Sequence, residues 1–101
     1  RESQEVKLIE YLERFVGQTF SATVSGVATY GAYVRLDNTA EGLIPCKNLG
    51  SEYFALDPVQ HRLTGQDTGA SYRLAQRLAV VLVSADPRAR RLDFRPARDE
   101  R

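Results

Sequence analysis

The stretch GQTFSATVSGVATYGAYVRLDNTAEGLIP, residues 17–45, decides which fold the sequence predicts. Apolar and polar side chains alternate over residues 19–27, which is typical of a strand with one buried face. Gly31 lies in the following turn and can adopt backbone angles that are closed to residues with a Cβ atom. Alternation resumes over residues 32–36, and residues 42–45 form a third short apolar run. The stretch therefore predicts three strands joined by two turns.

The side chains that this pattern leaves on the outer face suggest a binding surface. Tyr30 and Tyr33 are large aromatic residues, and Arg35 follows Tyr33 on the same side of the predicted strand. Aromatic rings beside cations are what a single-stranded nucleic acid needs, because bases stack on the rings while cations attract phosphates. A structural role, in which both tyrosines merely cover the barrel surface, is the alternative.

A helix is predicted before the first strand, over residues 2–16. Ser3 is a suitable N-cap and Gly17 a suitable end. The helix either packs on the end of the barrel or connects it to a preceding domain, and these two roles are compatible. Its apolar stripe recurs at three- and four-residue steps and consists of Val6, Leu8, Ile9, Leu12, Phe15 and Val16.

Residues 46–72 form a long segment without clear periodicity. A segment of this length between strands of a small domain is usually functional or disordered. Its polar, glycine-containing part at residues 64–69 is predicted as an exposed hairpin tip or loop. Tyr53 and Phe54 are expected on a short helix that plugs one end of the barrel.

Two further strands complete the prediction. Residues 78–83 are almost continuously apolar and are expected to form the most buried strand, followed by a turn at 86–90 and a last strand at 91–95. The fold class is therefore all-β with a short N-terminal helix: a five-stranded OB-fold Greek-key barrel with a long insertion between strands 3 and 4. Closure into a barrel removes the exposed edges that an open sheet would leave. Residues 96–101 are expected to be a loose tail.

Composition narrows the class of protein. The 101 residues suffice for one domain, and the net charge of +1 means that a nucleic-acid site depends on local arrangement. Cys46 is the single cysteine, so no internal disulfide is expected, and neither Cys46 nor His61 has partners at metal-ligand spacing. No apolar run is long enough for a membrane span, and we expect a monomeric cytoplasmic protein. The chain starts without methionine, which suggests a fragment of a longer protein.

Three quoted segments resemble a known family. VSGVATYGAYV at residues 24–34, EGLIP at 41–45 and VSADPRARRLDF at 83–94 are similar to the S-one RNA-binding domain, named after the largest protein of the small ribosomal subunit. NLGSEYF at 48–54 and HRLTG at 61–65 extend the resemblance to the C-terminal S-one domain of the bacterial ribonuclease R and ribonuclease II exoribonucleases.

The resemblance implies a domain organisation and a function. Residues 1–16 would connect to a preceding catalytic domain that uses magnesium, and residues 17–95 would be a barrel that helps to hold single-stranded RNA for 3′-5′ degradation. The chain itself would carry no cofactor and no catalytic residue. The implied partners are single-stranded RNA and that catalytic domain.

The resemblance also implies RNA contacts at particular positions. Tyrosines replace the usual phenylalanines, proline replaces the usual histidine, and lysine replaces the usual serine. For Asp86 and Arg90 the alternative role is a pair that only closes the turn. Together with Arg35 from the strand pattern, the predicted site residues are Tyr30, Tyr33, Arg35, Lys47, Asp86 and Arg90, with Pro45 at the histidine position.

Two other function classes compete with an RNA-binding module. A free-standing OB barrel that binds a protein or an oligosaccharide is allowed by the fold alone, and it predicts an exposed apolar patch in place of tyrosine with arginine. An enzyme in its own right would need an acid–base or metal constellation, and the sequence offers none.

Overall fold

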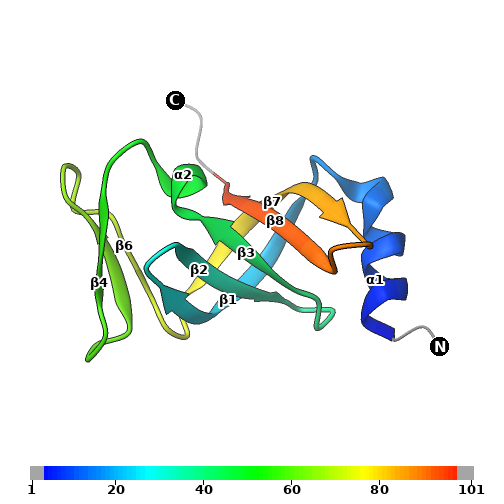
Figure 1. Ribbon diagram of the computed structural model, residues 1–101, viewed down its shortest axis with the longest axis horizontal. Coiled ribbons are helices and arrows are strands. Elements are labelled where there is room, and N and C mark those ends of the chain that lie inside the picture. Colours follow the sequence, from blue (N-terminus) through cyan, green and yellow to red (C-terminus); the bar gives the residue numbers. More distant parts are fainter. Residues whose placement is uncertain (1–3, 98–101) are drawn as a thin grey trace.

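The structure, a computed structural model, describes the backbone of residues 4–97 and the side chains of residues 7–97. Figure 1 shows a barrel in the middle, a helix at one end and a small second sheet at the other. The elements are α1 (Gln4–Leu12), η1 (Glu13–Phe15), β1 (Thr19–Ala28), β2 (Gly31–Leu36), β3 (Glu41–Pro45), α2 (Cys46–Leu49), β4 (Phe54–Asp57), β5 (Arg62–Gly65), β6 (Ser71–Arg73), β7 (Arg77–Asp86) and β8 (Arg91–Pro96).

Five strands close the barrel in the order β1-β2-β3-β8-β7, which confirms the predicted OB-type fold. Neighbouring strands pair antiparallel except β3 and β8, which run parallel with Leu43 opposite Asp93. Gly42 makes this parallel contact possible. A Cβ atom there would collide with the Phe94 ring and lie 2.6 Å from the Leu92 carbonyl oxygen.

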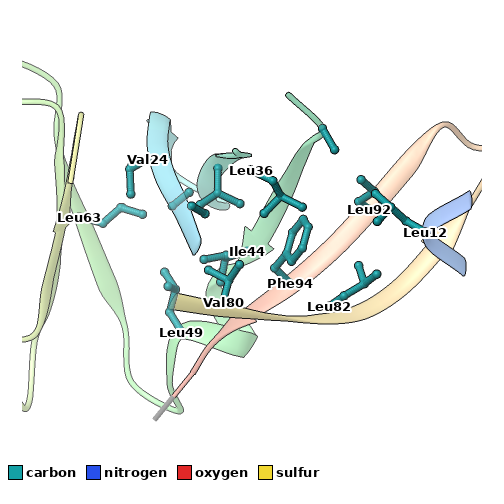
Figure 2. Packing of buried hydrophobic residues seen from close by; sticks show 14 of the residues in the cluster. Leu12, Val24, Leu36, Ile44, Leu49, Leu63, Val80, Leu82, Leu92 and Phe94 are labelled. Atoms are coloured by element: carbon teal, nitrogen blue, oxygen red, sulfur yellow. The ribbon is translucent and has the colours of Figure 1, made fainter. Parts of the chain in front are cut away.

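One hydrophobic cluster runs through the molecule (Figure 2). Figure 2 shows the Phe94 ring near its centre, with Leu63 of β5 and Val24 of β1 at one end and Leu12 of α1 at the other. All four side chains are almost completely buried. The barrel, the helix and the small sheet therefore share a single core.

The N-terminal helix packs on the barrel through Ile9 and Leu12, as one of its two predicted roles requires. Val16 is half-exposed, so its place in the predicted apolar stripe is wrong. The reason is that the helix ends in η1 and the chain leaves it at Gly17, whose N–H donates to the Leu82 carbonyl (2.7 Å). Ser3 and the side chain of Val6 lie outside the described part of the chain. No helix within residues 4–97 combines the length and the apolar composition that crossing a membrane requires.

The segment between β3 and β7 is more regular than predicted. It contains α2 and then the three-stranded sheet β4-β5-β6. The short helix expected at Tyr53 and Phe54 is wrong: Phe54 starts β4 and is buried beside the Tyr72 ring, with centroids 6.2 Å apart, whereas Tyr53 is exposed. A helix was not needed to bury Phe54, because alternation on β4 turns Phe54 and Leu56 to the core cluster.

A carboxylate orders the tip of the β5–β6 hairpin, a segment that the sequence predicts as an exposed hairpin tip or loop. Glu52 accepts hydrogen bonds from the backbone N–H groups of Asp67 (2.6 Å) and Thr68 (2.9 Å) and from the Thr68 hydroxyl (2.6 Å). These hydrogen bonds, the one from the Thr68 hydroxyl most of all, lower the pKa of Glu52. The loop is thus held by a side chain from outside it.

The last two strands differ from the prediction in the burial of β7 and in the end of β8. In β7 only Val80, Val81 and Leu82 are buried, and Val83 is exposed. Val83 follows the inward-facing Leu82, so its side chain points to the outer face of the strand. It also lies at the β-bulge between Leu82 and Ser84, where it has no residue opposite it in β8. Pro96, which the sequence predicts in the loose tail, is the buried last residue of β8. Residues 98–101 lie outside the described chain.

Candidate nucleic-acid interface

A tight β1–β2 turn positions the two tyrosines. Ala28 pairs with Gly31, and the Tyr30 carbonyl accepts a hydrogen bond from the Cys46 N–H (2.9 Å). A Cβ atom on Gly31 would collide with the Ile44 carbonyl oxygen, so glycine lets β2 approach β3 at this point. The backbone of the turn is therefore held by its pairing in β1–β2 and by the hydrogen bond to Cys46. The side chain of Tyr30 points away from this turn into solvent.

Tyr33 lies over a glycine. A register shift in β1 between Val24 and Gly26 places Gly26 opposite Tyr33, and a Cβ atom on Gly26 would lie only 3.8 Å from the tyrosine ring. Tyr30 and Tyr33 are 54% and 39% exposed, which confirms that both side chains face outward.

The two rings form a perpendicular pair. Their centroids are 6.0 Å apart with an angle of 89° between the planes, and the two hydroxyl groups are hydrogen-bonded to each other. The hydrogen bond between the two hydroxyls raises the pKa of Tyr33, while the positive charge of Arg91 acts in the opposite direction. The Tyr33 hydroxyl therefore stays protonated at neutral pH.

The β7–β8 turn lies across from the tyrosines. Asp86 accepts hydrogen bonds from the backbone N–H groups of Arg88 (3.1 Å) and Ala89 (3.2 Å), which closes the turn. Arg90 has a φ of 53°, a left-handed conformation that a four-residue turn needs before the strand resumes. The turn thus brings Arg90 and Arg91 to the β3 side of the barrel.

Together these elements form a cleft of about 550 Å³. One side is formed by the tyrosines, the base by β3, and the other side by the β7–β8 turn with the start of β8. Its lining residues are Tyr30, Tyr33, Glu41, Gly42, Leu43, Pro45, Ala89, Arg90, Arg91 and Leu92. The cleft therefore combines aromatic rings, an apolar base, two guanidinium groups and the carboxylate of Glu41.

Arg91 is oriented by its neighbour on β8. Its Nε donates to Asp93 Oδ1 at 2.7 Å, and this hydrogen bond raises the pKa of Arg91. Asp93 is in turn within 3.4 Å of the Ser84 hydroxyl. Arg91 remains charged at all working pH values, and Asp93 limits the directions in which it points.

The structure brings only part of the predicted site into the cleft. Tyr30, Tyr33 and Arg90 line it, as does Pro45. The other predicted residues do not. Arg35 does not line the cleft and forms an ion pair with Glu41 at 2.9 Å. Its effect on the cleft is therefore indirect, because it neutralises the carboxylate of a lining residue.

Two further predicted site residues, Asp86 and Lys47, also lie outside the cleft lining. Asp86 helps to close the turn, but it does so by accepting hydrogen bonds from the backbone N–H groups of Arg88 and Ala89 and not through the alternative pair with Arg90. Lys47 is exposed on α2, outside the cleft lining.

Sequence reasoning missed Arg91 and Leu43 as lining residues. Alternation over residues 91–95 does place Arg91 outward, but that pattern does not reveal which strand lies beside it. The parallel pairing of β3 with β8 joins residues far apart in the sequence and creates the cleft. Only a prediction of the β3–β8 pairing would have indicated that Arg91 and Leu43 line the same cleft.

Other reactive residues lie apart from this cleft. Burial raises the pKa of the Cys46 thiol, whose Sγ lies 3.5 Å from the Thr29 carbonyl oxygen. His61 is an exposed residue of the β4–β5 turn, with a φ of 52°. Among the described residues, no three His, Cys, Asp or Glu side chains gather in a way that could hold a metal ion. The magnesium that the resemblance implies therefore has no fitting ligand set in this part of the chain.

Comparisons with known proteins agree with the resemblance to ribonuclease R. Among curated proteins, Ribonuclease R of Escherichia coli (strain K12) is 34% identical over 87 residues, which cover 85% of this chain and 11% of that protein. Ribonuclease R 1 of Lactococcus lactis subsp. lactis (strain IL1403) is 29% identical over 94 residues, which cover 93% of this chain and 12% of that protein. The chain thus spans about one-tenth of the length of these relatives.

Solved structures support the fold. RNase R of Mycoplasma genitalium superposes with a TM-score of 0.84 at 24% identity, over 93% of this chain and 15% of that chain, both in its apo form and in complex with ribose methylated single-stranded RNA. GSP13 of Bacillus subtilis superposes with a TM-score of 0.59 at 20% identity, over 85% of this chain and 61% of that chain. At these identities the similarity concerns the fold alone.

The family model described as S1 RNA binding domain matches residues 13–95. This range includes four barrel strands in full, the fifth strand β8 up to residue 95, and all the residues that line the cleft. The chain therefore belongs to the S1 RNA-binding domain family.

Proposed function

We propose that this chain binds single-stranded RNA in the cleft and that it serves as the RNA-holding module of a 3′-5′ exoribonuclease. The magnesium-dependent catalytic domain would lie elsewhere in the same polypeptide. The observation that carries the proposal is the cleft itself, where Tyr30 and Tyr33 face Arg90 and Arg91 across an apolar base. The relatives' names supply the class of enzyme.

The chemistry of the cleft suits a flexible polyanion with stacked bases. Each base that stacks on an aromatic ring contributes about 1–3 kcal/mol, and it does so for any base because every base has a π-face. Arg90 and Arg91 can contact the phosphates between such bases. We therefore expect modest affinity, little sequence preference and a clear dependence on salt.

The cleft argues against the alternative of a barrel that binds a protein. Such a site would present a large apolar patch. Here the apolar base of Leu43 and Pro45 is flanked by two guanidinium groups and two phenolic hydroxyls. Binding of an oligosaccharide is an outcome that the titration below distinguishes.

Binding is tested by fluorescence titration of a short labelled oligoribonucleotide at two salt concentrations. We expect saturable binding that weakens as salt rises and that is lost in the double variant Tyr30→Ala/Tyr33→Ala. An unlabelled oligosaccharide should not compete. Equal binding by the wild type and the double variant would refute the proposed site.

The module's lack of hydrolysis is tested separately. End-labelled oligoribonucleotide incubated with this chain and magnesium should keep its length, because the proposal assigns metal-dependent chemistry to another domain. Progressive shortening that survives repurification of the protein would contradict this assignment.

A further inference from the structure

The hydroxyl groups of Tyr30 and Tyr33 do more than stacking requires. A phenyl ring would offer a base the same flat face without an oxygen atom. In the structure the two hydroxyls are hydrogen-bonded to each other, and both tyrosines line the cleft. Both residues remain partly exposed.

The pair has unused hydrogen-bonding capacity. A hydroxyl carries one donor and two acceptor lone pairs. One O–H is used between the two tyrosines, so the pair keeps a second O–H and free lone pairs. Within the described chain, no other hydrogen bond to either hydroxyl is observed. The pair can therefore donate to a ligand and accept from it at the same point.

No other side chain that lines the cleft within the described residues has this dual character. The guanidinium groups of Arg90 and Arg91 only donate, and the Glu41 carboxylate only accepts. The remaining lining residues have apolar side chains or none. Phosphates only accept hydrogen bonds, so the two arginines suit them better than the hydroxyl pair does.

We propose that the Tyr30–Tyr33 hydroxyl pair makes the cleft selective for ribose over deoxyribose by exchanging hydrogen bonds with a ribose 2′-hydroxyl. That group, like the tyrosine pair, both donates and accepts, and it is what distinguishes RNA from DNA. The inference rests on the proposed function, because it assigns a specificity to the same cleft. The rings hold the base, the arginines hold the phosphates, and the hydroxyl pair reads the sugar.

The test compares a short oligouridylate with its deoxyuridine counterpart, so that the base is the same in both. Each is titrated against the wild type, Tyr30→Phe, Tyr33→Phe and the double phenylalanine variant. Phenylalanine keeps the stacking face and removes only the hydroxyl. Tyr53→Phe is the matched control, since Tyr53 is exposed and lies outside the cleft.

We expect the wild type and Tyr53→Phe to bind the ribo-oligomer about two- to tenfold more tightly than the deoxy-oligomer, the factor that a net hydrogen bond typically gives. In the double variant the ratio should fall close to one, mainly because binding of the ribo-oligomer weakens. The deoxy-oligomer should bind all variants alike.

Two results would overturn the inference without touching the proposed function. One is a ribose preference that survives in the double variant. The other is equal weakening toward both oligomers, which would mean that the hydroxyls contact phosphate or hold the rings in place. Absence of binding of either oligomer to the wild type would instead refute the proposed function itself.

Discussion

The barrel and the β4-β5-β6 sheet both present arginines to solvent, but they differ in what surrounds these arginines. On the small sheet, Arg62 lies directly opposite Arg73 in register, with Arg62 hydrogen-bonded to Gln60. In the barrel, Arg90 and Arg91 share a cleft with two tyrosines. Cations alone attract any anion, whereas cations with stacking faces suit single-stranded nucleic acid. The difference favours the barrel as the proposed binding surface.

The two regions also differ in how they are held. The barrel is a closed ring of five strands, whereas β4 and β6 are the edges of an open sheet. The sheet joins the core through a few side chains, among them the fully buried Leu63. We therefore expect the sheet to open more readily than the barrel. The predictions below test this contrast.

The largest effect is expected from Phe94→Ala, at the centre of the barrel core. Truncation of a fully buried phenylalanine typically destabilises a protein by about 3–5 kcal/mol. Urea unfolding should show this loss, and RNA binding should disappear because β8 forms one side of the cleft. A loss below about 1 kcal/mol would mean that the barrel core is not centred on this ring.

Leu63→Ala should destabilise the protein by an amount near the lower end of the usual range of about 2–5 kcal/mol. Leu63 lies between the sheet and the barrel, so the sheet should loosen while the amide NMR signals of Tyr30 and Tyr33 keep their positions. Val59→Ala is the control, because Val59 is 85% exposed and should change nothing. Equal disturbance of both regions would show that they form one inseparable unit.

Tyr33→Ala should weaken RNA binding by about 1–3 kcal/mol without loss of stability, since the ring is a stacking face outside the core. Tyr30→Ala should weaken binding less, because Tyr30 is the more exposed of the two rings. Tyr53→Ala, in the segment that leads to the small sheet, should bind as the wild type does. Titration of a short oligoribonucleotide measures all three. If Tyr53→Ala weakened binding more than the two cleft variants do, the binding surface would lie near the small sheet and not in the cleft.

Arg91→Ala should reduce the slope of log binding constant against log salt concentration by about 0.7, the value for one phosphate contact with a single strand. Arg62→Ala removes the same charge from the small sheet and should leave the slope unchanged. Because phosphates carry no sequence information, Arg91→Ala should weaken binding equally for different RNA sequences. A changed slope in the Arg62 variant would contradict the contrast between the two regions.

The smallest effect concerns Glu52, whose hydrogen bonds hold the hairpin tip of the small sheet. Its pKa is lowered in the folded state, chiefly by the Thr68 hydroxyl, so its contribution is present above the ordinary value of 4.5 and is lost as the pH falls through the folded-state pKa. An NMR titration should show the Asp67 and Thr68 amide signals shifting in that acidic range. In Glu52→Gln these shifts should be absent, while the cleft residues behave alike in both proteins.

Much of the barrel could be predicted from local patterns. Alternation identified β1 and β2, because each buries one face against the same core. The continuous apolar run at residues 78–83 predicts a strand that is buried throughout, but Val83 lies on the outer face of β7 and is exposed. Local patterns also fail over residues 46–72. Strands of three or four residues are too short for a periodic signal, which is why the prediction of a helix at Phe54 is wrong.

The candidate site was predicted where it depends on local sequence and missed where it depends on distant pairing. Tyr30 and Tyr33 lie on one hairpin, so their outward direction follows from alternation. Arg91 joins them only because β8 pairs with β3. Arg35 has the correct outward direction, but its ion pair with Glu41 could not be read from strand periodicity.

The most direct test of the account is an NMR titration of the isotope-labelled chain with a short oligouridylate. The account predicts that backbone signals of residues 30–33, 42–45 and 89–92 shift together, and that signals of β4, β5 and β6 stay in place. Shifts confined to the β4-β5-β6 sheet, with the cleft residues unmoved, would contradict it.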